Sequence, residues 1–323
     1  MMLKEFAEEM HKREAFFLVC HVSPDADTLG SALALREGLL SLHKQVRIGC
    51  PDAVPGRLHC LPGWENVLYN GELPEDGETV LFVDVSAGDR MGVYSDCALP
   101  NLNSMCLDHH YTNPGLTGEG FAAFNYIEDC AASGELACLL LKELGIAFTP
   151  TIGMNLYAAI ASDTGNFAYS STTARTFSVM ADVMQSGFDL AGTNRSLFRN
   201  ISLRKTRLQA DALCRAEILA DGRGALAAVS EKDMAAFGAS KEDGDTIVDA
   251  LRDIDTVEAA VYLREEKEHV KASLRAKGNG NVGALAKKYG GGGHMQAAGC
   301  TLQMPLAEAT ELMRRELLAL LSK

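Results

Sequence analysis

Four short apolar segments, separated by polar turns and helical patterns, constrain the fold of this chain more than any other feature. They have the length and composition of buried strands and lie at residues 16–22, 45–50, 79–86 and 104–109. Helical periodicity lies between or after them, at residues 29–42, 132–145 and 151–162. This alternation is typical of a parallel sheet covered by helices on both faces, because parallel strands need crossover connections. The first half is therefore predicted to be an α/β domain.

The second half has a different pattern. A further helix is expected over 172–187, beginning in the Ser/Thr-rich stretch SSTTAR and ending at Gly187, and the strand pattern is then lost. An amphipathic stretch at 204–220 leads into the segment GALAAVS at 224–230. A helical region at 244–255 and two strand-like runs, at 257–264 and 269–275, follow. The sequence thus predicts an N-terminal domain at 1–188, a linker at 189–204 and a smaller α+β domain at 205–323.

Charge and composition limit the partners. A net charge of −13 argues against coating of long nucleic acid, which requires many Lys and Arg side chains on phosphates. A small anionic substrate remains compatible, because local basic groups can capture one or two phosphates. The N-terminal segment has no apolar run long enough for a signal peptide or a membrane span. Nine cysteines without a C-x-x-C pair indicate buried thiols in a reducing compartment, so a cytoplasmic protein without a membrane partner is expected.

Acidic residues and histidines gather where four of the predicted elements end. These residues are His21, Asp25 and Asp27 after the first strand, Asp84 after the third, Asp108, His109 and His110 after the fourth, and Asp163 after the helix 151–162. In an open α/β sheet, ligands bind outside the carboxyl ends of the strands. If those ends converge, the carboxylates repel one another unless cations lie among them. Oxygen-rich ligation with a minority of imidazoles favours two Mn²⁺ or Mg²⁺ ions sharing Asp84.

A purely structural interpretation stays open for each residue alone. Asp25 could initiate a turn after Pro24, Asp27 or Thr28 could cap the following helix, and buried histidines are common. The coincidence of four strand or helix ends is harder to explain in this way.

A second group of residues lies in the C-terminal half. The segment KASLRAK, at 271–277, alternates so that Lys271, Ser273, Arg275 and Lys277 share one face of a strand. Four glycines at 290–293 precede His294, and successive glycine amides can form a nest for phosphate. From composition alone, a flexible turn beside a solvated basic strand is the simpler interpretation.

Five motifs together resemble those of the DHH phosphoesterases. They are HVSPDADTLGS, DVS, LDHH, SDTGNFAYSSTTAR and GGGGHMQAAG, and they extend from about residue 15 to about residue 304. Their spacing is most similar to the subfamily of nucleases for very short oligoribonucleotides and phosphatases for 3′-phosphoadenosine-5′-phosphate (pAp). This resemblance implies an N-terminal parallel-sheet DHH domain, a C-terminal DHH-associated domain and an active site in the cleft between them.

The resemblance also implies roles for single residues. The ligands of one Mn²⁺ match His21, Asp25 and Asp84, and those of the second match Asp27, Asp84, His109 and Asp163, with Mg²⁺ as a substitute. His110 matches the catalytic histidine left free of metal, and Asp108 matches a residue that supports a histidine. The substrate-binding residues match Ser273, Arg275, Gly291, Gly292, Gly293 and His294. The chain departs from the pattern at Ala26, where glycine is frequent, and at Ala276, where serine is frequent.

The activity implied is Mn²⁺-dependent hydrolysis of very short RNA to mononucleotides and of pAp to AMP. A linear or cyclic dinucleotide phosphodiesterase is the alternative within the family, and a pyrophosphatase fits the GGGGH motif less well. A non-catalytic nucleotide-binding regulator is an alternative of another class, although every expected ligand position is filled. The sequence leaves the oligomeric state open.

Overall fold

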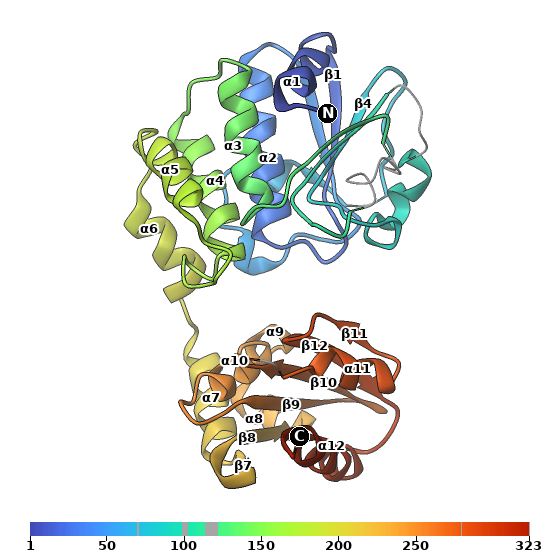
Figure 1. Cartoon of the computed structure of the whole chain (residues 1–323), viewed down its shortest axis with the longest axis vertical. Coiled ribbons are helices and arrows are strands. Elements are labelled where there is room, and N and C mark those ends of the chain that lie inside the picture. Colours follow the sequence, from blue (N-terminus) through green and yellow to red (C-terminus); the bar gives the residue numbers. More distant parts are fainter. Residues whose placement is uncertain (70, 99–102, 114–121, 279, 323) are drawn as a thin grey trace. The chain divides into compact units, whose positions relative to one another are not determined.

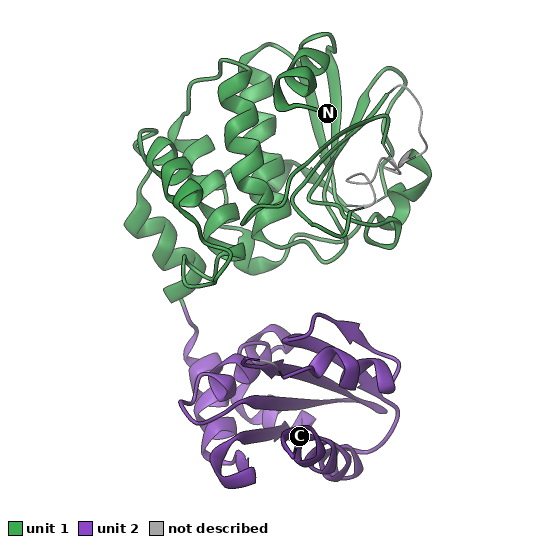
Figure 2. Cartoon of the chain, viewed as in Figure 1, with its two compact units in different colours: residues 1–200 green, residues 201–323 purple. Residues whose placement is uncertain are grey.

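The computed structural model describes residues 1–69, 71–98, 103–113, 122–278 and 280–322. The chain divides into two compact units, residues 1–200 and 201–323 (Figure 2). Among the described residues, no helix has the length and apolarity that crossing a membrane requires.

Unit 1 is built on a parallel sheet of six strands in the order β3-β2-β1-β4-β5-β6. Strands β1 and β4 of this sheet are labelled in Figure 1. The strands are β1 (Ala15–Val19), β2 (Gln45–Gly49), β3 (Val67–Leu68), β4 (Thr79–Val83), β5 (Ser104–Asp108) and β6 (Phe124–Ile127). Every strand pairing in this sheet's described residues is parallel. The predicted α/β fold is confirmed, and the four predicted strands end one to three residues earlier than expected.

The helices of unit 1 bury their apolar sides against this sheet and each other. They are α1 (Leu3–His11), α2 (Ala26–Ser41), α3 (Ser133–Glu143), α4 (Pro150–Asp163), α5 (Ala174–Met184) and α6 (Leu190–Asn194). Short 3-10 turns are η1 (Gly56–Leu58), η2 (Trp64–Asn66), η3 (Gly88–Arg90) and η4 (Gly92–Ala98). Helix α2 packs closely on α4, since a Cβ at Gly30 would lie 2.5 Å from the Asn155 carbonyl oxygen. It begins three residues earlier than predicted because Asp25 caps it.

The segment expected as a linker, 189–204, is mostly helical. It contains α6 and a π-helical turn, η6 (Arg195–Arg199), and the boundary between the two compact units falls after Asn200. Asn194 donates a hydrogen bond of 2.6 Å to the Tyr157 hydroxyl on α4. This contact joins the segment to unit 1.

Unit 2 has a second six-stranded sheet, in the order β11-β12-β10-β9-β8-β7, which is antiparallel except for the β8–β9 pair. Its strands are β7 (Glu217–Leu219), β8 (Gly224–Val229), β9 (Ala259–Glu266), β10 (His269–Ala276), β11 (Gly292–Gly293) and β12 (Ala297–Leu302). Its helices are α7 (Leu203–Cys214), α8 (Glu231–Phe237), α9 (Lys241–Gly244), α10 (Ile247–Arg252), α11 (Val282–Lys288) and α12 (Leu306–Leu321), with a 3-10 turn η7 (Ala220–Gly222). The predicted α+β character of the C-terminal part is confirmed.

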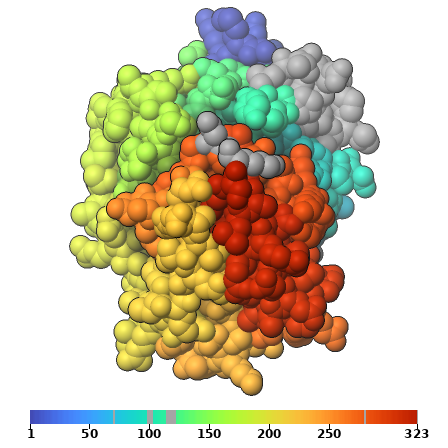
Figure 3. Space-filling model, turned by 60° about the horizontal axis from the view of Figure 1, so that its bottom comes forward, coloured from blue at the N-terminus to red at the C-terminus, as the bar shows by residue number. Residues whose placement is uncertain are grey.

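The two faces of this second sheet have separate apolar cores. One face packs against α11 and α12, where Met313 and Leu317 contribute to the core. The other face packs against α7 and α10, and Tyr262 of β9 lies in that core. Helix α12, dark red in Figure 3, forms part of the surface of unit 2 and leaves Leu318 38% exposed.

Candidate metal centre

The candidate site lies at the carboxyl ends of β1, β4 and β5. These three strands are neighbours in the sheet, and the strand order reverses between β1 and β4. Ligands of open α/β sheets bind at such a reversal, outside the carboxyl ends of the strands. Three groups of side chains there present possible ligand atoms within 4.8 Å of one another: His21, Asp25 and Asp84; Asp27, His109 and Asp163; and Asp84, His109 and His110.

One carboxylate oxygen of Asp25 contacts the backbone of α2, and the other faces the candidate site. Its Oδ1 accepts hydrogen bonds from the backbone amides of Asp27 and Thr28, at 2.9 and 3.1 Å, and thereby caps α2. Its Oδ2 lies 3.4 Å from Nε2 of His21. The helix cap therefore holds one carboxylate oxygen in place and directs the other toward the site.

Asp27 is fully buried in the first turn of α2. Its two oxygens accept hydrogen bonds from the backbone amides of Ser133 and Gly134, at 2.7 and 2.9 Å. These amides belong to the first turn of α3, and the unsatisfied N–H groups of a helix N-terminus favour a negative charge. The start of α3 thus orients a carboxylate that lies more than 100 positions earlier in the chain.

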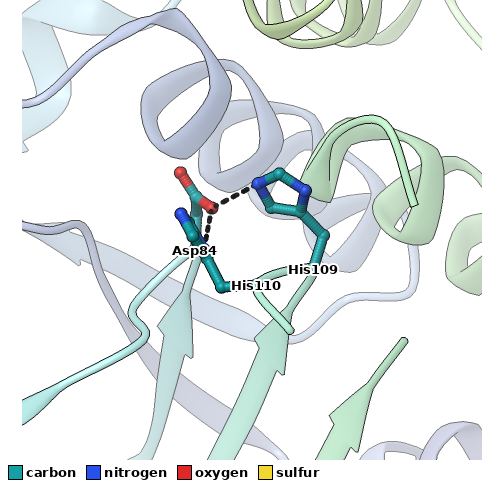
Figure 4. Close-up of side chains that lie close together, drawn as sticks. All are labelled: Asp84, His109 and His110. Atoms are coloured by element: carbon teal, nitrogen blue, oxygen red, sulfur yellow. Dashed lines mark ion pairs between the residues drawn. The ribbon is translucent and has the colours of Figure 1, made fainter. Parts of the chain in front are cut away.

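Asp84 lies at the centre of the site, next to the end of β4 (Figure 4). Its side chain is nearly buried, and its Oδ1 accepts a hydrogen bond of 3.0 Å from the Ser133 hydroxyl. The backbone of Asp84 has φ of +60°, a left-handed conformation that is rare for a residue other than glycine. Such strain persists where surrounding contacts hold it, and it is concentrated at functional sites.

The two site histidines share one arrangement. Nδ1 of His21 lies 2.7 Å from the Val22 carbonyl oxygen, and Nδ1 of His109 lies 3.0 Å from the Cys130 carbonyl oxygen. A backbone carbonyl accepts only from a protonated nitrogen, so each ring carries its proton on Nδ1 and has a lone pair on Nε2 when neutral. Both Nε2 atoms are buried and have no hydrogen-bond partner among the described residues.

These two lone pairs face carboxylates. Nε2 of His21 lies 3.5 Å from Asp84 Oδ2, and Nε2 of His109 lies 3.5 Å from Asp84 Oδ1. Nε2 of His109 also lies 3.7 Å from Asp27 Oδ2 and 3.4 Å from Asp163 Oδ2. The separations exceed those of normal N–H···O bonds. Buried lone pairs that face anionic oxygens favour cations between them, so this donor set fits two divalent metal ions.

The electrostatics of the metal-free protein are consistent with this fit. Burial lowers the pKa of His21, but Asp25 and Asp84 outweigh it and raise the pKa to about 10. Burial and the neighbouring Asp84 raise the pKa of Asp163 to about 8, and they raise that of Asp27 well above its usual range. Without metal, the pocket therefore holds protons where cations would otherwise balance the carboxylates.

His110 differs from the other two histidines. Its Nδ1 lies 2.8 Å from Asp108 Oδ1, and the other oxygen of Asp108 accepts a hydrogen bond of 2.6 Å from the Asn113 amide. Burial lowers the pKa of His110, whereas the bond to Asp108 raises it, and the net shift is upward. Its side chain is 30% exposed, compared with 12% for His109. The Asp108 carboxylate thus fixes the orientation of a ring that solvent can reach.

Three side chains of this site were not predicted from the sequence. Ser133 contacts Asp84, Asn113 contacts Asp108, and the Thr28 hydroxyl donates a hydrogen bond of 2.8 Å to the Val83 carbonyl oxygen. The only sequence signal for Ser133 is its place at the start of the helix predicted over 132–145, where serine commonly serves as a cap.

The substrate-binding residues expected in unit 2 lie on β10 and around β11. Ser273 and Arg275 alternate with the buried residues Ala272 and Leu274 along β10, as predicted for one face of a strand. Nε of Arg275 donates a hydrogen bond of 3.0 Å to Asp249 on α10. The arginine is therefore held in place by an acidic neighbour.

The glycines before His294 have different surroundings. A Cβ at Gly291 would lie 2.1 Å from the Gly299 carbonyl oxygen, and one at Gly293, where φ is +130°, would lie 2.5 Å from the Ala297 carbonyl oxygen. Close packing of β11 on β12 therefore explains two of the three glycines. Gly292 faces open space, and the amide of His294 bonds to the Ala297 carbonyl oxygen at 2.8 Å.

Comparison with known proteins identifies the family of the chain. Residues 15–162 match the DHH family, N-terminal domain, and residues 224–323 match the DHHA1 domain. The bifunctional oligoribonuclease and PAP phosphatase NrnA of Thermus thermophilus is 31% identical over 291 residues, which cover 89% of this chain and 84% of that protein. The chain belongs to the DHH family.

Two further relatives extend this result. The Bacillus subtilis protein of the same name, NrnA, is 26% identical over 292 residues, covering 87% of each chain. The crystal structure of an exopolyphosphatase-related protein from Bacteroides fragilis has a TM-score of 0.89 and 25% identity, and it covers 98% of this chain and 95% of that chain. The fold of this DHH family member is thus shared over nearly its whole length with a solved structure.

Proposed function

We propose that this chain is a Mn²⁺-dependent phosphohydrolase that degrades very short oligoribonucleotides to mononucleotides and converts pAp to AMP. The observation that carries the proposal is that the buried Nε2 atoms of His21 and His109 face the carboxylates of the site and have no hydrogen-bond partner in the described part of the chain. The similarity to relatives named as bifunctional oligoribonucleases and PAP phosphatases supports the choice of substrate.

The residues divide between two metal positions. His21, Asp25 and Asp84 would hold the first ion, and Asp27, Asp84, His109 and Asp163 would hold the second. Two Mn²⁺ ions held there would supply positive charge against the phosphoryl oxygens and would lower the pKa of an attacking water. The protein's own contribution is orientation. Backbone amides of α3 fix Asp27, the Ser133 hydroxyl fixes Asp84, and carbonyl oxygens fix both imidazoles.

His110 is assigned to the reacting phosphate. Because its Nδ1 is bonded to Asp108, the proton that it can transfer is on Nε2. A ring held in this way can donate that proton to the leaving oxygen, and the buried carboxylate stabilises the charged ring before transfer. Asp108 acts through His110 and is a positioning residue.

Unit 2 is assigned to holding the remainder of the substrate. The open face at Gly292 allows a phosphate to approach backbone amides, and the Arg275 guanidinium and the exposed His294 side chain add donors. Ser273, which shares the face of β10 with Arg275, adds a hydroxyl. The pairing of Arg275 with Asp249 preorganises the guanidinium and also lowers its net attraction for anions.

The experiment that tests this function is a panel of four substrates with Mn²⁺ supplied: pAp, a two-nucleotide RNA, a cyclic dinucleotide and pyrophosphate. We expect AMP from pAp and mononucleotides from the RNA, with much slower turnover of the other two substrates. Preferential hydrolysis of the cyclic dinucleotide or of pyrophosphate would assign the chain to a different activity within the family. No hydrolysis of any of the four by folded, Mn²⁺-loaded protein would favour a binding role.

A further inference from the structure

Unit 1 contains a cavity of about 660 Å³ that the proposed chemistry does not use. One wall is aromatic, formed by Tyr157 of α4 and Phe167, whose ring centroids lie 6.3 Å apart. The opposite part is formed by the segment from Leu190 to Arg199, which includes α6 and the π-helical turn. The volume lies within the range of small-molecule sites, roughly 300 to 1,000 Å³.

The cavity is lined by positively charged side chains, whereas the chain as a whole is negatively charged. Arg195 and Arg199, which begin and end the π-helical turn, both line it and are both exposed. Neither forms an ion pair within the described ranges, and no residue that lines the cavity is acidic. In a protein with a net charge of −13, two arginines without carboxylate partners indicate a local site for an anion. π-Helical turns are themselves rare and frequent at functional sites.

Three polar side chains that line the cavity are hydrogen-bonded to one another. The Asn194 amide donates to the Tyr157 hydroxyl at 2.6 Å and to Asn166 Oδ1 at 3.1 Å, and the Tyr157 hydroxyl lies 3.3 Å from Asn166 Oδ1. Asn166 and Phe167 both have left-handed backbone conformations, with φ of +56° and +67°. Two consecutive strained residues are unexpected in an ordinary surface loop, and such strain accompanies binding sites.

The cavity is close in sequence to the metal centre. Asn166 follows Asp163 by three residues, so their Cα atoms are separated by no more than about 11 Å of extended chain. The loop that carries Asn166 and Phe167 to the cavity therefore begins directly after the proposed metal ligand Asp163.

We propose that this cavity is a nucleotide-binding subsite for a further nucleoside monophosphate unit of the short RNA. Arg195 and Arg199 hold the phosphate of that unit, and its base packs against the partly exposed ring of Phe167, while the buried Tyr157 holds Asn166 and Asn194 in place behind it. Guanidinium groups suit phosphate recognition, and aromatic rings accept any base by stacking. The inference rests on the proposed function, because it adds a third binding position for the same RNA substrate to those assigned to the metal centre and unit 2.

The first test compares substrates of different length. The double variant Arg195→Ala/Arg199→Ala and the control Arg57→Ala, an exposed arginine outside the cavity, are assayed with pAp and with a three-nucleotide RNA. We expect the ratio of kcat/KM for the RNA to kcat/KM for pAp to fall about tenfold in the double variant, through KM, because charge-assisted contacts are lost only by the longer substrate. The control should keep the wild-type ratio. An unchanged ratio in the folded double variant would overturn the inference.

A second test does not depend on hydrolysis. A three-nucleotide RNA of 5-iodouridine is bound to the wild-type protein, irradiated, and the crosslinked residue is identified by mass spectrometry. The inference predicts crosslinks to Phe167, the partly exposed aromatic ring of the cavity, and crosslinks confined to residues outside the cavity would contradict it. If crosslinks form at the cavity but no RNA or pAp is hydrolysed, the proposed function fails while the subsite remains.

Discussion

Replacing Ser133 with alanine isolates one contact of the metal centre. The hydroxyl of Ser133 donates to Asp84 Oδ1 at 3.0 Å, while its backbone amide donates to Asp27 Oδ2 at 2.7 Å. The alanine variant keeps the amide, so the orientation of Asp27 is retained. Only the oxygen of Asp84 that faces His109 loses its support.

The size of the effect follows from the type of bond. A hydrogen bond to a charged group contributes about 1.5 to 3 kcal/mol. At about 1.4 kcal/mol per factor of ten, this corresponds to roughly ten- to a hundredfold weaker Mn²⁺ binding. The range agrees with the roughly 10- to 100-fold losses that follow removal of residues supporting metal ligands. The fold should survive, because one buried hydroxyl is replaced by a methyl group without a change of backbone.

The assay is a titration of Mn²⁺ against the rate of pAp hydrolysis. Ser133→Ala should need roughly ten- to a hundredfold more Mn²⁺ for half-maximal rate and should recover most of the rate at saturation. Ser31→Ala is a matched control, because it removes a buried hydroxyl that contacts Asp27 at the longer distance of 3.4 Å and should change the requirement less. An unchanged Mn²⁺ requirement in folded Ser133→Ala would refute the positioning role.

Three other changes test separate parts of the site. His110→Ala should keep both metal ions and slow hydrolysis, because it is assigned to the phosphate, and loss of Mn²⁺ in metal analysis would place His110 among the ligands. Arg275→Ala should cost about ten- to a hundredfold in kcat/KM on pAp and much less on a small generic phosphodiester, whereas equal losses would assign the arginine to the fold through Asp249. Burial and Asp84 raise the pKa of Asp163 to about 8 in the metal-free protein, so Mn²⁺ binding must displace protons and should strengthen from about pH 6 to 8. Calorimetry in two buffers of different ionisation enthalpy measures that release, and its absence at neutral pH would contradict the assigned ligands.

The sequence predicted the first domain well because its signals are local. Buried parallel strands are continuous apolar runs, and those of β1, β4 and β5 are followed within two residues by polar residues of the site. Local signals could not decide whether the loop before α2 caps a helix or serves a ligand. The structure gives Asp25 both contacts, since one oxygen caps the helix and the other faces His21.

Other features depend on contacts between distant segments. Ser133 supports a carboxylate 49 positions earlier, and no pattern near Ser133 specifies that partner. The strand β3 has only two residues, too few for a periodic signal. Gly291 and Gly293 suggested a phosphate nest from their sequence, but their spacing against β12 is visible only in the fold. The helical character of 189–204 likewise depends on packing against Tyr157.

The most direct test of the two-metal centre is the Mn²⁺ content and activity of Asp84→Ala. One oxygen of Asp84 lies 3.5 Å from Nε2 of His21 and the other lies 3.5 Å from Nε2 of His109, so the loss of Asp84 removes an oxygen from both proposed metal positions together. We expect the wild-type protein to bind two Mn²⁺ ions per chain by metal analysis and to hydrolyse pAp, and the folded variant to bind Mn²⁺ poorly and show no measurable turnover. A folded Asp84→Ala protein that kept near-normal Mn²⁺-dependent hydrolysis would contradict the shared position of this carboxylate and, with it, the two-metal centre.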